Sequence, residues 1–147
     1  MIIKYDNISA QQKTHNGEVA MGKKKNKANK QVAANAAAAE PVHGKRIEFT
    51  AGAWRFYNAQ SEAVKAEFDI ALTELETKGR LVPPMGKNIA PNLYEIRVKV
   101  DPNQYRLFYC YFDPDGVLVL SGFVKKTRKT PRHEIDAAKR IRSGVLK

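Results

Sequence analysis

The sequence has almost no cysteine, because Cys110 is the single one among 147 residues. One thiol excludes an internal disulfide and is typical of a reducing compartment, so a cytoplasmic location is expected. Long apolar runs are also missing, and none approaches the roughly 20 residues that a membrane-spanning helix needs. The sequence contains neither Cys/His spacing typical of zinc sites nor a glycine-rich phosphate loop. These absences argue against a secreted disulfide scaffold and a membrane span, and no metal or cofactor is expected.

Acidic residues are scarce beside basic ones, and the excess of basic residues is unevenly distributed. Of the formal net charge of +11, residues 1–47 contribute +6, residues 48–124 contribute −2 and residues 125–147 contribute +7. The positive charge therefore lies at the two ends of the chain. A dense basic patch usually faces a polyanion, most often nucleic acid. A solvated, solubilising surface is the alternative interpretation.

Large apolar side chains are nearly absent from residues 7–41, where a lysine–asparagine run is followed by an alanine-rich stretch. Such a segment cannot bury enough surface to offset its ordering entropy. We therefore predict a disordered basic tail over residues 1–44 and a folded domain over residues 45–147. A secretory signal beginning at Met21 is rejected because its apolar region is only alanine, interrupted by Asn35. Two hypotheses stay open: the tail is an RNA-tethering arm, or the chain starts at Met21.

The rest of the sequence predicts helices and strands of ordinary length. Residues 45–50 have the pattern of a strand, and residues 52–58 that of a short helix. A longer helix is predicted from the N-cap Ser61 to Gly79, with an apolar stripe at helical spacing. That stripe consists of Val64, Phe68, Leu72 and Leu75.

A proline-rich connection is expected over residues 80–92, followed by three strands with short turns between them. These strands span residues 93–100, 104–112 and 117–124, and Thr130 with Pro131 opens a last helix. The order β-α-α-β-β-β-α is an α+β fold with an antiparallel sheet. Alternation along the first of the three strands predicts one apolar face and one open polar face. The polar face carries Glu95, Arg97 and Lys99.

Three segments carry a resemblance to a known family. LYEIRV, YRLFY and SGFVKKTRKTP, in this order and spacing, resemble the RelE/ParE toxin superfamily, and most of all its HigB-like, phage-associated branch. The resemblance covers residues 46–142. It implies a microbial RNase-like fold and a toxin of a type II toxin–antitoxin pair. It further implies metal-independent cleavage of mRNA on the ribosome, by attack of the 2′-hydroxyl on the adjacent phosphate, and a helix-turn-helix antitoxin as partner.

The resemblance also implies site residues. Such cleavage needs a base, an acid and cations that stabilise the developing phosphorane charge. Arg106 matches an arginine of the family's third strand, and Arg97 matches a basic position on the strand before it. The catalytic residues implied are Arg106, Arg97, Lys126, Lys129 and His133. The RNA-binding residues implied are Lys99, Lys125, Arg128 and Arg132.

Alternatives accompany these assignments. Arg97 and Arg106 could instead be sheet-face arginines paired with Glu95 or Asp101. Only one of two adjacent lysines at a strand exit, Lys125 and Lys126, would face a cleft, and the register decides which. His133 could be a plain surface residue rather than an acid or base, as first-turn histidines more often are. Alternation makes Tyr94 point inward, which favours core packing over a role at RNA. Glu95 could act as a base, although relatives often carry a basic residue at its position.

Two other functions compete with RNA cleavage. One is a ParE-like poison of DNA gyrase, against which the FVKKTRKTP stretch argues. The other is a relative that has lost catalysis, keeps the fold and only binds nucleic acid or a partner. The position of Glu95 and the unusual tail keep this second hypothesis open.

Overall fold

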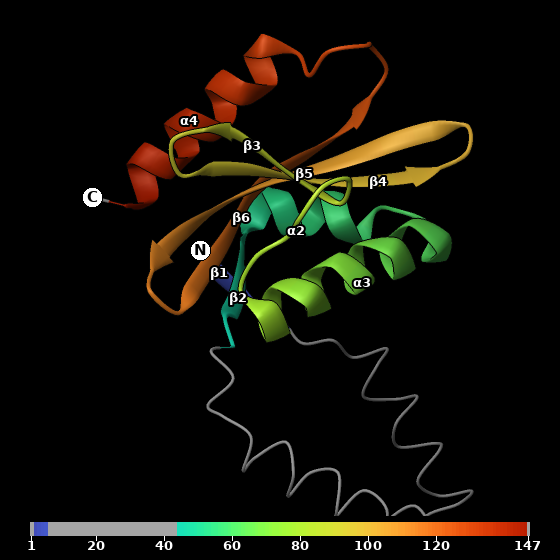
Figure 1. The fold of residues 1–147 in the computed structure, drawn as a ribbon. Coiled ribbons are helices and arrows are strands. Elements are labelled where there is room, and N and C mark those ends of the chain that lie inside the picture. The colour runs from blue at the N-terminus through green and yellow to red at the C-terminus, as the bar shows by residue number, and fades with distance from the viewer. Residues whose placement is uncertain (1, 6–43, 147) are drawn as a thin grey trace, which may run out of the picture. The chain divides into compact units, whose positions relative to one another are not determined.

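The computed structural model describes residues 2–5 and 44–146 and arranges them as helices on both faces of one mixed sheet. The sheet has six strands in the order β1-β2-β6-β5-β4-β3. Helices α2 and α3 lie against one face and α4 lies against the other (Figure 1). The elements are β1 (Ile2–Lys4), β2 (Arg46–Thr50), α2 (Ala51–Asn58), α3 (Glu62–Lys78), β3 (Gly86–Ala90), β4 (Leu93–Val100), β5 (Asn103–Asp113), β6 (Gly116–Lys125) and α4 (Arg132–Val145).

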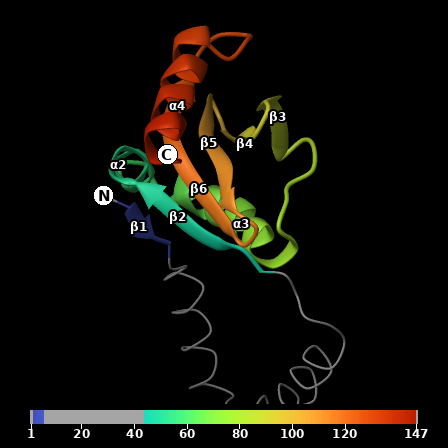
Figure 2. The same ribbon diagram turned by 90° about the vertical axis from the view of Figure 1, so that its left-hand side faces the viewer.

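The predicted α+β class is confirmed, including the antiparallel pairs β4–β5 and β5–β6. β2 pairs with β6 in parallel, and the chain between them contains helices α2 and α3 and strands β3 to β5. The predicted connection over residues 80–92 was wrong in part, because β3 forms there and pairs with β4 at the sheet edge. Its sequence GKNIA has weak strand propensity, so pairing with β4 rather than its own side chains accounts for the strand. Figure 2 shows β3 at the edge opposite β1.

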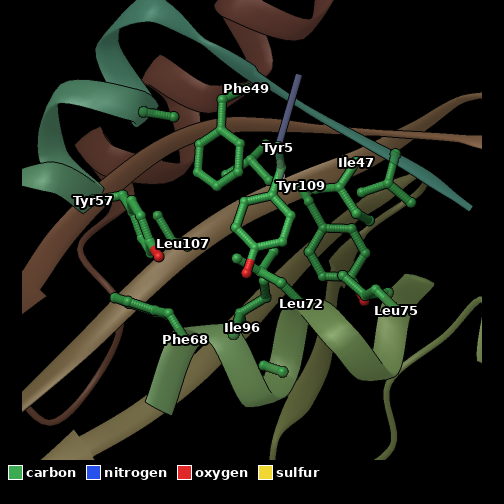
Figure 3. Packing of buried hydrophobic residues seen from close by; sticks show 14 of the residues in the cluster. Tyr5, Ile47, Phe49, Tyr57, Phe68, Leu72, Leu75, Ile96, Leu107 and Tyr109 are labelled. Atoms are coloured by element: carbon green, nitrogen blue, oxygen red, sulfur yellow. The ribbon is translucent and has the colours of Figure 1, made fainter. Parts of the chain in front are cut away.

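Helix α3 follows the sequence pattern from cap to cap. The Ser61 hydroxyl accepts a hydrogen bond from the backbone N–H of Val64. At the other end Gly79 adopts the left-handed conformation, with φ of 79°, which a residue without Cβ enters at no steric cost. The predicted apolar stripe is buried against the sheet in a core that Figure 3 shows. Side chains that face this stripe include Phe49, Ile96, Leu107 and Tyr109.

The first residues of the chain belong to this core, contrary to the predicted tail boundary. β1 pairs antiparallel with β2, with Ile3 opposite Phe49. Tyr5 is only 5% exposed, and its hydroxyl donates to Asp69 Oδ1 at 2.8 Å. Tyr57 donates to the same oxygen. Residues 2–5 therefore join the folded domain, and a chain starting at Met21 would lack them. The remaining predicted tail, residues 6–43, lies outside the described residues.

Replacing Tyr5 by alanine is expected to lower the free energy of unfolding by about 3 kcal/mol, because it removes a buried ring and a hydrogen bond. Urea denaturation at equilibrium measures the change. Ile2→Ala is the control: Ile2 lies on the same strand but is 46% exposed, so its loss is expected to stay near 0.5 kcal/mol. Equal, small losses for both variants would show that β1 does not dock.

The second face of the sheet is only partly open, which corrects the prediction of a polar and available face. Ala138 of α4 is fully buried over Phe108 and Leu118, and Ile135 and Ile141 pack around them. Cys110 lies in the same cluster, and burial raises the pKa of its thiol to about 11, so it is unreactive at neutral pH. Helix α4 starts at Arg132, one residue later than predicted, because Pro131 has an extended backbone and occupies the N-cap position. Next to the start of α4 the face is uncovered and forms a cleft.

Candidate functional site

A cleft of about 380 Å³ opens where β3 and β4 meet the end of β6 and the start of α4. The segment between β6 and α4, residues 126–131, forms one wall and is called the basic loop below. Among the described residues that line the cleft, cations dominate, one residue is acidic and none is aromatic. The lining residues are Lys87, Asn88, Ile89, Glu95, Arg97, Lys125, Arg128, Lys129, Thr130 and Ile135.

Arg97 and Arg106 lie directly opposite each other on β4 and β5. Like charges at such a pair destabilise a sheet unless a counter-charge offsets them. Glu95 supplies it: its Oε1 lies 3.7 Å from Arg97 Nε and 3.5 Å from Arg106 Nε. The pairing of both arginines with Glu95 is the alternative that the sequence left open. Arg97 keeps 34% of its side chain exposed and lines the cleft, whereas Glu95 is almost fully buried.

Arg106, first among the predicted catalytic residues, lies beneath the cleft rather than in its wall. Its side chain is 3% exposed, and its terminal nitrogens donate to Gln104 Oε1 at 2.7 Å and to the Tyr105 carbonyl at 3.1 Å. Burial lowers the pKa of Arg106; the Glu95 charge raises it, and the Arg97 charge lowers it. Protein groups therefore hold this guanidinium, which places a positive charge under the cleft floor.

At the end of β6 the structure distinguishes the two adjacent lysines. Lys125 lines the cleft, whereas Lys126 is exposed and does not. The cause is a bulge: Ser121 pairs with Phe108 and Val119 with Tyr109, which leaves Leu120 without a partner. Val119 faces α3, and strict alternation of side chains along β6 from Val119 would make Lys125 face α3 as well. The extra residue in the bulge reverses the alternation, so Lys125 faces α4 instead. Burial lowers the pKa of Lys125, as does the nearby charge of Arg106.

Other predicted residues lie apart from the cleft. His133 is exposed on the first turn of α4. Arg132 is 93% exposed, with Nε 4.0 Å from Asp136. Lys99 Nζ lies 3.7 Å from Asp101. Of the nine predicted site residues, the structure brings Arg97, Lys125, Arg128 and Lys129 together in the cleft, and it leaves Arg106, Lys99, Lys126, Arg132 and His133 outside its lining.

The basic loop is joined to the sheet by a residue that the sequence assigned only to the start of the helix. Thr130 Oγ1 donates to Glu95 Oε2 at 2.9 Å. Within the loop, Thr127 Oγ1 donates to the Lys129 carbonyl at 2.6 Å. No sequence signal could have paired Thr130 with Glu95, because the contact spans 35 positions. Lys87 was missed for a related reason, since it faces Glu95 only through the unpredicted pairing of β3.

Neither a metal centre nor a membrane span emerges from the part of the chain that the structure describes. Within residues 2–5 and 44–146, His, Cys, Asp and Glu side chains do not gather in groups of three or more that could hold a metal ion. The helices in these ranges are too short or too polar to cross a bilayer. Tyr94 stacks on Tyr109 with ring centroids 5.3 Å apart, so the predicted inward orientation of Tyr94 is confirmed.

The fold and the cleft define an α+β protein with a cationic groove beside one long helix. The family described as "Phage derived protein Gp49-like (DUF891)" matches residues 55–143, and the chain belongs to this family. The expected phage-associated branch is thereby confirmed. Among solved structures, a mutant of the E. coli toxin RelE in the free state is similar, with 23% identity and a TM-score of 0.48. The match covers 67% of this chain and 98% of that chain. None of the curated proteins matches the chain.

Proposed function

We propose that this protein is the toxin of a type II toxin–antitoxin pair and cleaves mRNA on the ribosome without a metal ion. The observation that carries the proposal is the cleft, in which Arg97, Lys125, Arg128 and Lys129 converge from two strands and a loop. Converging cations suit a reaction whose transition state concentrates negative charge on phosphate oxygens. Membership of the phage-derived family and the resemblance of the SGFVKKTRKTP segment to HigB-like toxins support the same activity.

In this mechanism the RNA 2′-hydroxyl attacks the adjacent phosphate, and the products are a cyclic phosphate and a free 5′-hydroxyl. Arg97, a third exposed at the cleft, contacts the non-bridging oxygens with its guanidinium. Lys125 donates a proton to the leaving 5′-oxygen, because a lowered pKa makes an ammonium group a better acid near neutral pH, and the proton of the 2′-hydroxyl passes to water. Arg128 and Lys129 hold the flanking phosphates. A helix-turn-helix antitoxin, mRNA and the ribosome are the proposed partners.

Glu95 is a weak candidate for the catalytic base. The two arginines engage its Oε1, and Thr130 donates to its Oε2, so both oxygens already have partners inside the protein. With 1% of the side chain exposed, the carboxylate is positioned to neutralise guanidinium charge rather than to accept a proton from RNA.

The test is induced expression in a bacterial host, with growth recorded and new mRNA 5′ ends mapped in the same cultures. Wild-type protein is expected to arrest growth and cut translated messages. Arg97→Gln is expected to remove about 99% of the cutting, because it deletes one charge at the phosphate. Lys78→Met on α3, on the other face of the sheet, should arrest growth as wild type does. Arrest with DNA damage and intact mRNA would instead indicate a gyrase poison, and normal growth would indicate a binding protein.

A further inference from the structure

The basic loop concentrates like charge next to a sheet face that is itself cationic. Lys126, Arg128 and Lys129 follow Lys125 within five residues. Across the cleft lie Arg97 and, beneath the floor, Arg106. Mutual repulsion would drive such a loop away from the sheet and into solvent. Something in the fold must therefore hold it in place when no polyanion is bound.

Two features of the described residues oppose this repulsion. The first is Glu95, the single acidic residue in the cleft lining, whose carboxylate lies within 3.7 Å of the two arginine Nε atoms. The second is the hydrogen bond from Thr130 to the other oxygen of that carboxylate. A bond to an ionised acceptor is about twice as strong as a neutral one, and burial strengthens it further. One carboxylate thus connects β4, β5 and the basic loop.

We infer that Thr130 and Glu95 form a latch that positions the basic loop for cleavage. The inference rests on the proposed function. Thr130 is a positioning residue: its hydroxyl has a partner inside the protein, and it acts by fixing where Arg128 and Lys129 lie. Because Pro131 follows at once and occupies the N-cap position of α4, the latch also anchors the point where the helix begins. A loop released from the latch still carries all its cations, but Arg128 and Lys129 are no longer held at fixed positions in the cleft.

The inference predicts a change in turnover rather than in binding. Electrostatic attraction to RNA depends on the number of cations, which a Thr130 substitution leaves unchanged. Catalysis depends on their placement, since a displacement of roughly 1 Å can lower a rate about 100-fold. Thr130→Val removes the hydroxyl and keeps the branched shape. Thr130→Ser keeps the hydroxyl and serves as the matched control.

Two measurements test the latch. The first is ¹⁵N relaxation of the full chain: wild type and Thr130→Ser are expected to have order parameters near 0.85 at residues 126–130, and Thr130→Val values below about 0.6. The second is single-turnover cleavage of mRNA on programmed ribosomes. There Thr130→Val is expected to lower the rate at saturation at least ten-fold, with less than a two-fold change in half-saturating concentration, while Thr130→Ser retains the wild-type rate.

The outcomes separate the latch from the proposed function. Unchanged order parameters in Thr130→Val would overturn the latch whatever the cleavage rate. A mobile loop that still cleaves at the wild-type rate would overturn its positioning role. A wild-type protein that cleaves no mRNA would overturn the proposed function, while the relaxation data would still decide whether the latch exists. A parallel loss of melting temperature and of all activity in both Thr130 variants would show a merely structural role.

Discussion

Glu95→Ala is expected to lower the free energy of unfolding by about 4 kcal/mol, the largest stability change predicted for a single residue of this chain. Removing one partner of a buried ion pair leaves the other charge uncompensated, and such changes typically destabilise by roughly 3–5 kcal/mol. Here the remaining partner would be Arg106, which is 3% exposed in the wild-type protein and whose Nε has no hydrogen-bond partner among the described residues. Thr130 would lose its acceptor at the same time. Urea denaturation monitored by Trp54 fluorescence measures the change.

Two further variants make the interpretation specific. Glu62→Ala breaks an exposed pair, in which Lys65 Nζ lies 3.2 Å from a carboxylate that is 91% exposed, so the loss is expected to stay below about 1 kcal/mol. Adding Arg106→Met to Glu95→Ala is expected to recover part of the stability, because the unpaired buried charge is removed as well. A loss below about 1 kcal/mol for Glu95→Ala alone would show that the arginines do not depend on this carboxylate.

Lys125→Met is expected to lower mRNA cleavage about 100-fold and to raise the melting temperature. The activity falls because a cation in the cleft wall is lost, together with its proton. The stability rises because folding lowers the pKa of Lys125 from its ordinary value of 10.5, so the charged form disfavours the folded state at neutral pH. That penalty lessens as the pH rises toward 10.5. Single-turnover cleavage and thermal unfolding at pH 7 measure the two effects.

The adjacent lysine provides the comparison. Lys126→Met removes the same charge one residue further along, where the side chain is exposed and outside the cleft lining. We expect at most a five-fold loss of cleavage, of the size that general attraction for RNA explains. Lys78→Met on α3 controls for loss of net charge and should leave cleavage unchanged. A greater loss for Lys126→Met than for Lys125→Met would reverse the assignment that the β6 bulge makes.

Local patterns predicted some elements well because the chemistry that shapes them lies within a few residues. Helix α3 carries its cap, its apolar stripe and its terminating glycine in one continuous stretch. The turns between β4, β5 and β6 are equally local. β1 and β3 escaped prediction because each obtains its structure from a neighbouring strand. β1 pairs with residues 44 to 48 positions away, and β3 lies between prolines.

The candidate site was predicted in composition but not in arrangement. The density of basic residues from the end of β6 onward, with the resemblance of that segment, indicated an anion-binding wall. Three of its predicted members, Lys125, Arg128 and Lys129, line the cleft together with Arg97 of β4. Arg106 was ranked first because it matches an arginine of the third strand in the RelE/ParE toxin superfamily. The structure shows that its face of the sheet is closed over it, by Gln104 and by the ion pair with Glu95. Burial of a residue on a strand depends on what packs above it, and the strand's own pattern does not contain that information.

The sequence by itself determined the α+β class, the antiparallel strands β4 to β6, the family and the basic character of the segment between β6 and α4. Each of these depends on residue type and short spacing. Only the tertiary structure decided that Lys125 rather than Lys126 faces the cleft, because one extra residue in β6 reverses the alternation. It also decided that Glu95 supplies the counter-charge to two arginines and accepts the Thr130 hydrogen bond. The physical reason is that pairing and burial join groups far apart in the chain, and the energy of a charge depends on those neighbours.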